Sequence, residues 1–115
     1  MKYKGGCHCG RIAFDVDAEI GKVIECNCSI CSKRGYLLAF VPAAQVDLHT
    51  SEADMLTYTF STHRIKHHFC PVCGVGPFGC GKDKSGADTF ALNVRCLEGI
   101  DLHALEIQPF DGRSR

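Results

Sequence analysis

Three cysteines stand within six residues of this chain, in the motif Cys26-Asn27-Cys28-Ser29-Ile30-Cys31. Thiols this close can ligate one metal ion, and thiolates are soft ligands that favour zinc, Cu(I) or an iron–sulfur cluster. A tetrahedral zinc ion with only three protein ligands keeps a fourth position for water or substrate. The motif therefore predicts an open, catalytic metal site formed by Cys26, Cys28 and Cys31.

Four more cysteines occur in two motifs of the metal-binding type. Cys7 and Cys9 form a C-x-C turn bracketed by glycines, and Cys70 and Cys73 form a C-x-x-C knuckle followed by Gly74. A structural zinc site is closed by four ligands, so these cysteines could join the two segments through one ion. Because short, glycine-rich strands bury little surface, we expect such a site to stabilise the fold.

The spacing leaves two other partitions open. Cys28 and Cys31 could join Cys70 and Cys73 in a zinc ribbon of two C-x-x-C knuckles, which would make the chain a binding module rather than an enzyme. A single metal ion with spare thiols is the other arrangement. A redox or metal sensor, which releases its zinc when its thiols are oxidised, is a further functional alternative.

The cysteine count also bears on the cellular compartment. The total of nine is odd, which does not suit a disulfide framework, and the N-terminal residues contain no apolar segment typical of a secretory signal. We therefore expect a cytoplasmic protein whose clustered cysteines bind metal. Cys80 and Cys96 stand apart from the clusters, and we expect them to be small buried residues.

Length and charge exclude several classes of protein. A chain of 115 residues is expected to form one domain, residues 1–115. Its 13 basic and 13 acidic residues balance, so no positive field attracts nucleic acid, and the basic stretch 63–68 lacks aromatic stacking platforms. The uncharged, mostly apolar stretch at residues 35–46 is shorter than the roughly 18 apolar residues of a membrane-spanning helix.

The hydrophobic pattern predicts a mainly β protein. No helical period extends beyond a few residues, whereas short alternating segments are separated by turn residues. We expect strands at residues 11–17, 23–24, 36–41, 46–49, 56–61, 89–94 and 105–107, with helical turns at 32–35 and 101–104. Pro77, Gly79 and Gly81 predict irregular structure after the second knuckle.

Three thiolates around Zn²⁺ leave a net charge of −1 on the predicted open site. Such a zinc ion is a weaker Lewis acid than one held by neutral histidines, and it should accept an added thiol as its fourth ligand. The expected chemistry is therefore activation of a thiol beside a carbonyl carbon.

With these residues in view, the chain resembles the glutathione-dependent formaldehyde-activating enzyme family, which is related to centromere protein V. The resemblance covers roughly residues 3–112. It rests on four motifs: Gly6-Cys7-His8-Cys9-Gly10, Cys26-x-Cys28-x-x-Cys31, Phe69-Cys70-x-x-Cys73-Gly74 with Pro77-Phe78, and Phe110-Asp111-Gly112.

The resemblance implies an Mss4-like fold of small coiled antiparallel sheets around two zinc sites. It implies that Cys7, Cys9, Cys70 and Cys73 hold the structural zinc, and that Cys26, Cys28 and Cys31 hold the catalytic zinc. The implied activity is that of a carbon–sulfur lyase, which joins glutathione to formaldehyde as S-hydroxymethylglutathione. The expected partners are a small glutathione-like thiol and an aldehyde.

Further side chains are candidates to support this chemistry. Lys33, Arg34, Arg64 and Lys66 could pair with the carboxylates of a glutathione-like thiol. His67 and His68 should point to opposite faces of a strand, so at most one of them can face the site.

Overall fold

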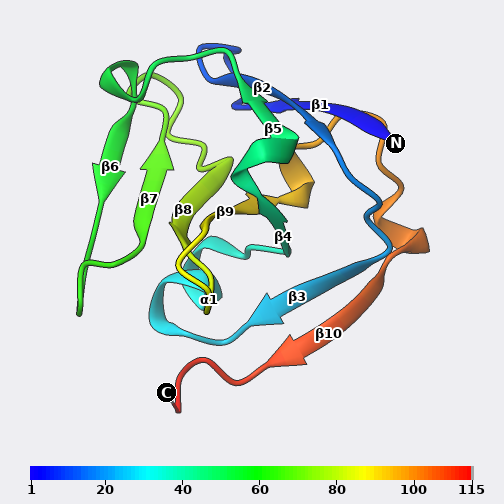
Figure 1. Ribbon diagram of the computed structural model, residues 1–115, viewed down its shortest axis with the longest axis vertical. Helices are drawn as coiled ribbons and strands as arrows, with labels where there is room; N and C mark the ends of the chain where they lie inside the picture. Colours follow the sequence, from blue (N-terminus) through cyan, green and yellow to red (C-terminus); the bar gives the residue numbers. More distant parts are fainter. Residues whose placement is uncertain (115) are drawn as a thin grey trace.

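The computed structural model describes residues 1–114, which form two β-sheets, one short α-helix and several 3₁₀ turns (Figure 1). The ten strands of this part of the chain are β1 (Lys2–Gly6), β2 (Ala13–Asp17), β3 (Lys22–Cys26), β4 (Leu38–Pro42), β5 (Val46–Leu48), β6 (Leu56–Tyr58), β7 (Lys66–Phe69), β8 (Phe78–Lys82), β9 (Asp88–Asn93) and β10 (Glu106–Phe110). The helix α1 spans Ser29–Arg34, and 3₁₀ turns occur at Ala43–Gln45, Glu52–Asp54, Val94–Cys96 and Leu102–Ala104.

The smaller sheet has three strands in the order β1-β2-β5, and the larger has seven in the order β10-β3-β4-β9-β8-β7-β6. The predicted mainly β class with antiparallel sheets is confirmed. One pairing differs: β10 runs parallel to β3, with Phe110 opposite Cys26 (Figure 1). This pairing brings the C-terminal strand beside the three-cysteine motif.

The core lies where the two sheets meet. Ile12, Phe14 and Val16 alternate toward the interior, as the sequence pattern predicted. The Phe14 ring of the small sheet meets the Phe78 ring of the large sheet edge-on, at 5.8 Å between centroids and an interplanar angle of 79°. Each fully buried side chain of this size contributes about 1.5–3 kcal/mol, so this contact helps to hold the sheets together.

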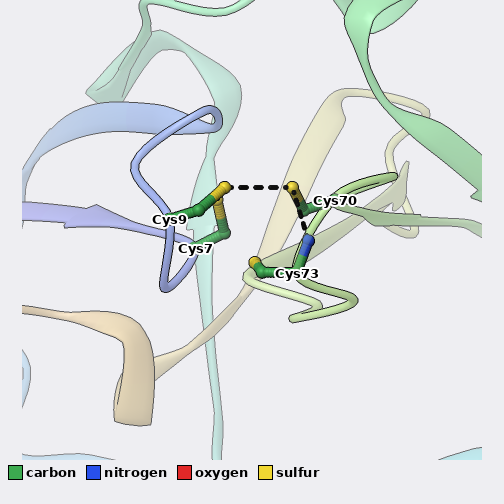
Figure 2. A group of neighbouring side chains, drawn as sticks. All are labelled: Cys7, Cys9, Cys70 and Cys73. Atoms are coloured by element: carbon green, nitrogen blue, oxygen red, sulfur yellow. Dashed lines mark hydrogen bonds between the residues drawn. The ribbon is translucent and has the colours of Figure 1, made fainter.

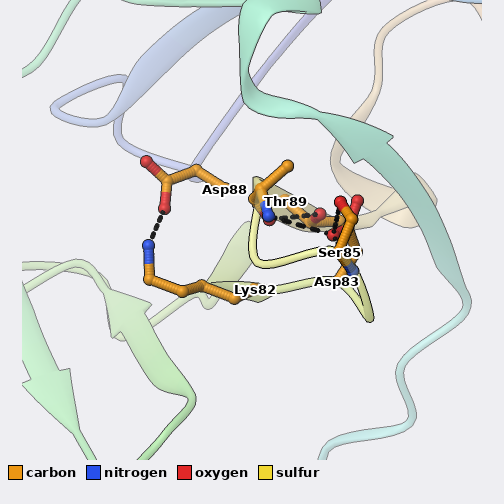
Figure 3. Close-up of polar contacts among 6 residues, drawn as sticks. Lys82, Asp83, Ser85, Asp88 and Thr89 are labelled. Carbon is orange, nitrogen blue, oxygen red and sulfur yellow. Dashed lines mark hydrogen bonds and ion pairs between the residues drawn. The ribbon is translucent and has the colours of Figure 1, made fainter.

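A tight hairpin joins β8 to β9 (Figure 3). Oδ1 of Asp83 accepts hydrogen bonds from the Ser85 backbone at 2.9 Å, the Ser85 hydroxyl at 2.6 Å and the Ala87 backbone at 3.0 Å. Lys82 Nζ donates to Asp88 Oδ1 at 2.7 Å across the two strands. These hydrogen bonds fix the turn between the two strands.

The structure differs from the expected local structure in three places. Residues 78–82 form strand β8 and are not irregular, because β7 and β9 pair with them on both sides. Residues 2–6 form strand β1, which the sequence pattern did not predict. The helical turn expected at 32–35 is a longer helix that begins at Ser29 and includes Cys31.

In the described residues, no helix is long and apolar enough to cross a membrane.

Candidate metal centres

The two cysteines near the N-terminus, Cys7 and Cys9, lie together with Cys70 and Cys73 (Figure 2). The Sγ atoms of Cys7, Cys9, Cys70 and Cys73 are all within 4.8 Å of one another. Cys9 Sγ lies 3.7 Å from Cys7 Sγ and 3.5 Å from Cys70 Sγ. A zinc–sulfur bond of 2.3 Å in a tetrahedron separates the sulfurs by about 3.8 Å, so the group could hold a metal ion and fits zinc.

Two backbone turns orient these thiols. Gly10 N donates to the Cys7 carbonyl at 3.4 Å, and Gly10 has a φ of 86°, which favours glycine. In the second turn, Gly74 N donates to the Cys70 carbonyl at 3.0 Å, and Gly74 has a φ of 79°. The glycines that flank both motifs thus allow the chain to fold back around the sulfurs.

Backbone N–H groups also favour the thiolate forms that metal binding needs. Cys70 Sγ accepts from the N–H groups of Val72 and Cys73, at 3.3 Å and 3.4 Å. Hydrogen bonds from the backbone of Val75 and Cys9 lower the pKa of Cys73 to about 6. His8, between the two N-terminal cysteines, does not belong to this group.

The Sγ atoms of Cys26, Cys28 and Cys31 form a second group within 4.8 Å of one another. Cys26 ends β3, Cys28 is the N-cap of α1, and Cys31 lies in the helix with a 6% exposed side chain. Among the described residues, no fourth Cys, His, Asp or Glu joins this group. The structure does not place Cys28 and Cys31 with Cys70 and Cys73, as a zinc ribbon would require, because Cys70 and Cys73 lie with Cys7 and Cys9.

In the second group, the pKa values of Cys28 and Cys31 are shifted in opposite directions. Burial opposes ionisation of Cys28, but the backbone N–H of Cys31 and neighbouring donors lower its pKa overall. Burial raises the pKa of Cys31, and the nearby Cys28 raises it further. Three thiolates this close repel one another, so a bound cation is needed to keep them ionised together.

The C-terminal segment closes one side of this group through Asn27. The backbone N–H of Asn27 donates to the Phe110 carbonyl at 3.1 Å, and its side-chain amide donates to Asp111 Oδ1 at 3.0 Å. The side-chain oxygen of Asn27, Oδ1, accepts a hydrogen bond from the backbone N–H of Arg113 at 2.9 Å. The Phe110-Asp111-Gly112 motif therefore has a structural role, because it fixes the loop that holds Cys26 and Cys28.

A cavity of about 420 Å³ has the three thiols in its wall. Its apolar lining comes from Ile24, Ile30, Leu38, Phe40, Phe60, Ile65, Phe78, Ala91 and Phe110, and the remaining lining residues are Tyr36, His67, Gly79 and Asn93. A second hollow, of about 450 Å³, shares Ile30 and Phe60 with it and is lined also by Lys33 and Arg34.

Comparison with known proteins identifies the family of the chain and a similar solved structure. The family model of the glutathione-dependent formaldehyde-activating enzyme matches residues 2–108. The chain belongs to this family. A crystal structure of a Rhodobacter sphaeroides protein is similar, with a TM-score of 0.75 and 27% sequence identity over 94% of this chain and 100% of that one. Membership of the formaldehyde-activating family indicates an enzyme-like activity that is glutathione-dependent and formaldehyde-activating, or related to it.

In this member of the formaldehyde-activating family, the four basic side chains that could bind a carboxylate line two separate hollows. Lys33 and Arg34 line the hollow beside the three thiols, whereas Arg64 and Lys66 line a separate hollow near Cys80. Arg34 is held in place, because its Nη1 donates to the Tyr36 hydroxyl at 2.8 Å and its guanidinium lies 5.2 Å from the Phe69 ring centroid.

The two adjacent histidines of β7 lie on different faces of the strand. His67 lines the cavity beside the thiols and stacks on Phe60 at 5.5 Å between centroids. Burial lowers the pKa of His67, so its imidazole is neutral at physiological pH. His68 is 1% exposed, and its Nδ1 bonds to the Thr57 hydroxyl at 3.0 Å.

Cys80 and Cys96 lie outside both cysteine groups and are partly buried. Cys80, Glu52 and His68 have potential ligand atoms within 4.8 Å of one another, a grouping that the sequence did not indicate. His68 Nε2 faces Glu52 Oε1 at 3.7 Å, and Lys66 and Lys82 line the hollow that Cys80 borders. We interpret the group as a buried imidazole beside a carboxylate, because the two lysines oppose binding of a cation.

Proposed function

We propose that the chain is a zinc-dependent carbon–sulfur lyase that joins a thiol to an aldehyde and reverses this addition, as S-(hydroxymethyl)glutathione synthase does. The observation that supports this most strongly is the group of Cys26, Cys28 and Cys31, which has no fourth protein ligand in the described residues and borders a cavity. We further propose a second, structural zinc on Cys7, Cys9, Cys70 and Cys73, and a cytoplasmic location for the protein.

Zinc bound by the three thiolates would supply the charge that keeps an added thiol ionised at neutral pH. The chain's own residues then have separate tasks. Lys33 offers an ammonium group to a carboxylate of a glutathione-like thiol, and the neighbouring Arg34 is already positioned by Tyr36 and Phe69.

Addition of a thiol to an aldehyde forms a bond between sulfur and the carbonyl carbon, and the proton of the thiol ends on the carbonyl oxygen. His67 is the candidate to move this proton, because its neutral imidazole lines the cavity that the thiols border. The apolar wall excludes water, which would otherwise compete for the aldehyde.

The test is zinc counted per chain, together with formaldehyde–glutathione exchange followed by NMR, in wild type and Cys28→Ser. We expect the substitution to remove one zinc and the catalysed exchange, while Cys96→Ser, outside both groups, retains both zincs and the exchange. Two tightly held zincs per chain and an unchanged exchange rate in Cys28→Ser would show that this residue does not belong to an open metal centre.

A further inference from the structure

The cavity beside the three thiols is larger than a one-carbon aldehyde requires. It has a volume of about 420 Å³, whereas one water molecule occupies about 30 Å³ in the liquid. Cavities of roughly 300–1,000 Å³ are typical sites for ligands with many heavy atoms. Formaldehyde would leave most of this cavity without a contact.

The lining of the cavity also does not suit the charged parts of glutathione. Among its described lining residues there is no Lys, Arg, Asp or Glu, and the polar side chains are Tyr36, His67, Asn93 and the three cysteines. A carboxylate or ammonium group placed there would lose its hydration without gaining an ionic partner. Lys33 and Arg34 line the adjoining hollow, so the charged ends of the thiol have a separate place to bind.

Large apolar side chains surround the cavity and are partly open to solvent. Phe40 is 55% exposed, Ile65 is 52% exposed and Phe110 is 37% exposed. They come from β4, from the segment before β7 and from β10, so three separate parts of the chain bring apolar surface to one place. A hydrophobic ligand would remove this surface from water, which is favourable in proportion to the area covered.

We propose that the aldehyde handled by this site carries a hydrophobic substituent of several carbon atoms, aliphatic or aromatic, which this cavity binds. This inference rests on the proposed function. The thiol sulfur bonds to the carbonyl carbon, the carbon–oxygen π bond breaks, and the thiol proton ends on the oxygen. The product is a hemithioacetal, so the step needs no oxidant or reductant.

The experiment compares catalysed exchange of glutathione with formaldehyde, butanal, hexanal and octanal, measured as kcat/KM by NMR on the zinc-loaded protein. We expect kcat/KM to rise with chain length by up to about fourfold per methylene while the chain fits the cavity. A highest value for formaldehyde would overturn the inference and leave the proposed function intact.

Ile65→Ser and Ile107→Ser form a matched pair of variants. Both side chains are about half exposed, at 52% and 45%, but only Ile65 lines the cavity. We expect Ile65→Ser to lower kcat/KM for hexanal about fivefold relative to kcat/KM for formaldehyde, while Ile107→Ser leaves this ratio unchanged. Equal effects of the two variants on hexanal would contradict the inference.

A binding measurement separates the inference from the proposed function. Hexanol has the same alkyl chain but no carbonyl group, and its binding to the zinc-loaded protein can be followed through methyl chemical shifts. We expect shifts at the methyl groups of Ile24, Ile30 and Ile65 in the wild type, and weaker shifts at Ile24 and Ile30 in Ile65→Ser. If hexanol binds but no aldehyde is exchanged, the proposed function is refuted, and the conclusion that the cavity binds a hydrophobic ligand stands. If hexanol does not bind, the inference is refuted.

Discussion

Gly112 lies directly against Cys26, although the two residues are far apart in the sequence. A Cβ atom on Gly112 would be 2.5 Å from Cys26 Sγ, closer than real Cβ contacts, and 3.2 Å from Cys28 Cβ, tighter than most of them. The hydrogen bond between Asn27 and Asp111 holds the C-terminal segment in this position. A side chain at residue 112 would therefore displace either the tail or the thiol.

We predict that Gly112→Ala weakens zinc binding at the three-thiol group by about 10- to 100-fold, the range seen when residues that support metal ligands are changed. Competition with a chromophoric chelator would measure the affinity of each zinc separately. Gly21→Ala is the matched control, because a Cβ at Gly21 meets no atom within 4 Å. The same loss of affinity in both variants would rule out this role for Gly112.

Cys9→Ser should destabilise the whole fold. Cys9 is exposed, so its side chain adds little to core packing, but its sulfur lies 3.5 Å from that of Cys70. Structural zinc in small peptides binds with roughly 10–16 kcal/mol near neutral pH, and loss of one ligand should remove several kcal/mol of this. We expect Tm, measured by circular dichroism, to fall by more than 10 °C. Cys80→Ser is the comparison, and an equal fall in both variants would contradict the structural role.

The Asp83 carboxyl should titrate at an unusually low pH. Hydrogen bonds from the Ser85 hydroxyl and the Ala87 backbone lower the pKa of Asp83 below its ordinary value of 3.8. Because the folded pKa is the lower one, the bonds stabilise the hairpin fully above pH 3.8, and this contribution is lost as the pH falls through the folded pKa. NMR titration should give a higher pKa for Asp83 in Ser85→Ala, and the same value in Lys84→Ala as in wild type. No difference between Ser85→Ala and wild type would exclude the hydroxyl as the cause.

Local patterns predicted the parts of this fold that depend on neighbouring residues. The alternation of Ile12, Phe14 and Val16 predicted β2 and its buried face, because a strand directs every second side chain to one side. The three cysteines around α1 are close because six residues of chain span little distance. The spacing also suggested that Cys7 and Cys9 would meet Cys70 and Cys73, but it left the zinc ribbon open.

Features that depend on distant segments were not predictable from the same patterns. Irregular structure was predicted for residues 78–82 because of their glycines. These residues form a strand because β7 and β9 supply hydrogen-bond partners on both sides. Gly79 suits this position, since a Cβ there would lie 3.3 Å from the Lys66 carbonyl oxygen. The apolar cavity likewise combines side chains from several strands, and no single stretch of the sequence indicates it.

Cys80 and Cys96 should resist alkylation at neutral pH. Burial raises the pKa of each thiol to about 11, so both are protonated at pH 8, and only the thiolate reacts with iodoacetamide. We expect mass spectrometry of the zinc-loaded protein to show slow modification of both cysteines, with a rate that rises about tenfold per pH unit from pH 8 toward pH 11. The chain unfolded in guanidinium is the control, because its thiols have ordinary pKa values and should react rapidly at pH 8. Modification of Cys80 and Cys96 at the unfolded rate in the folded protein would show that burial does not protect them.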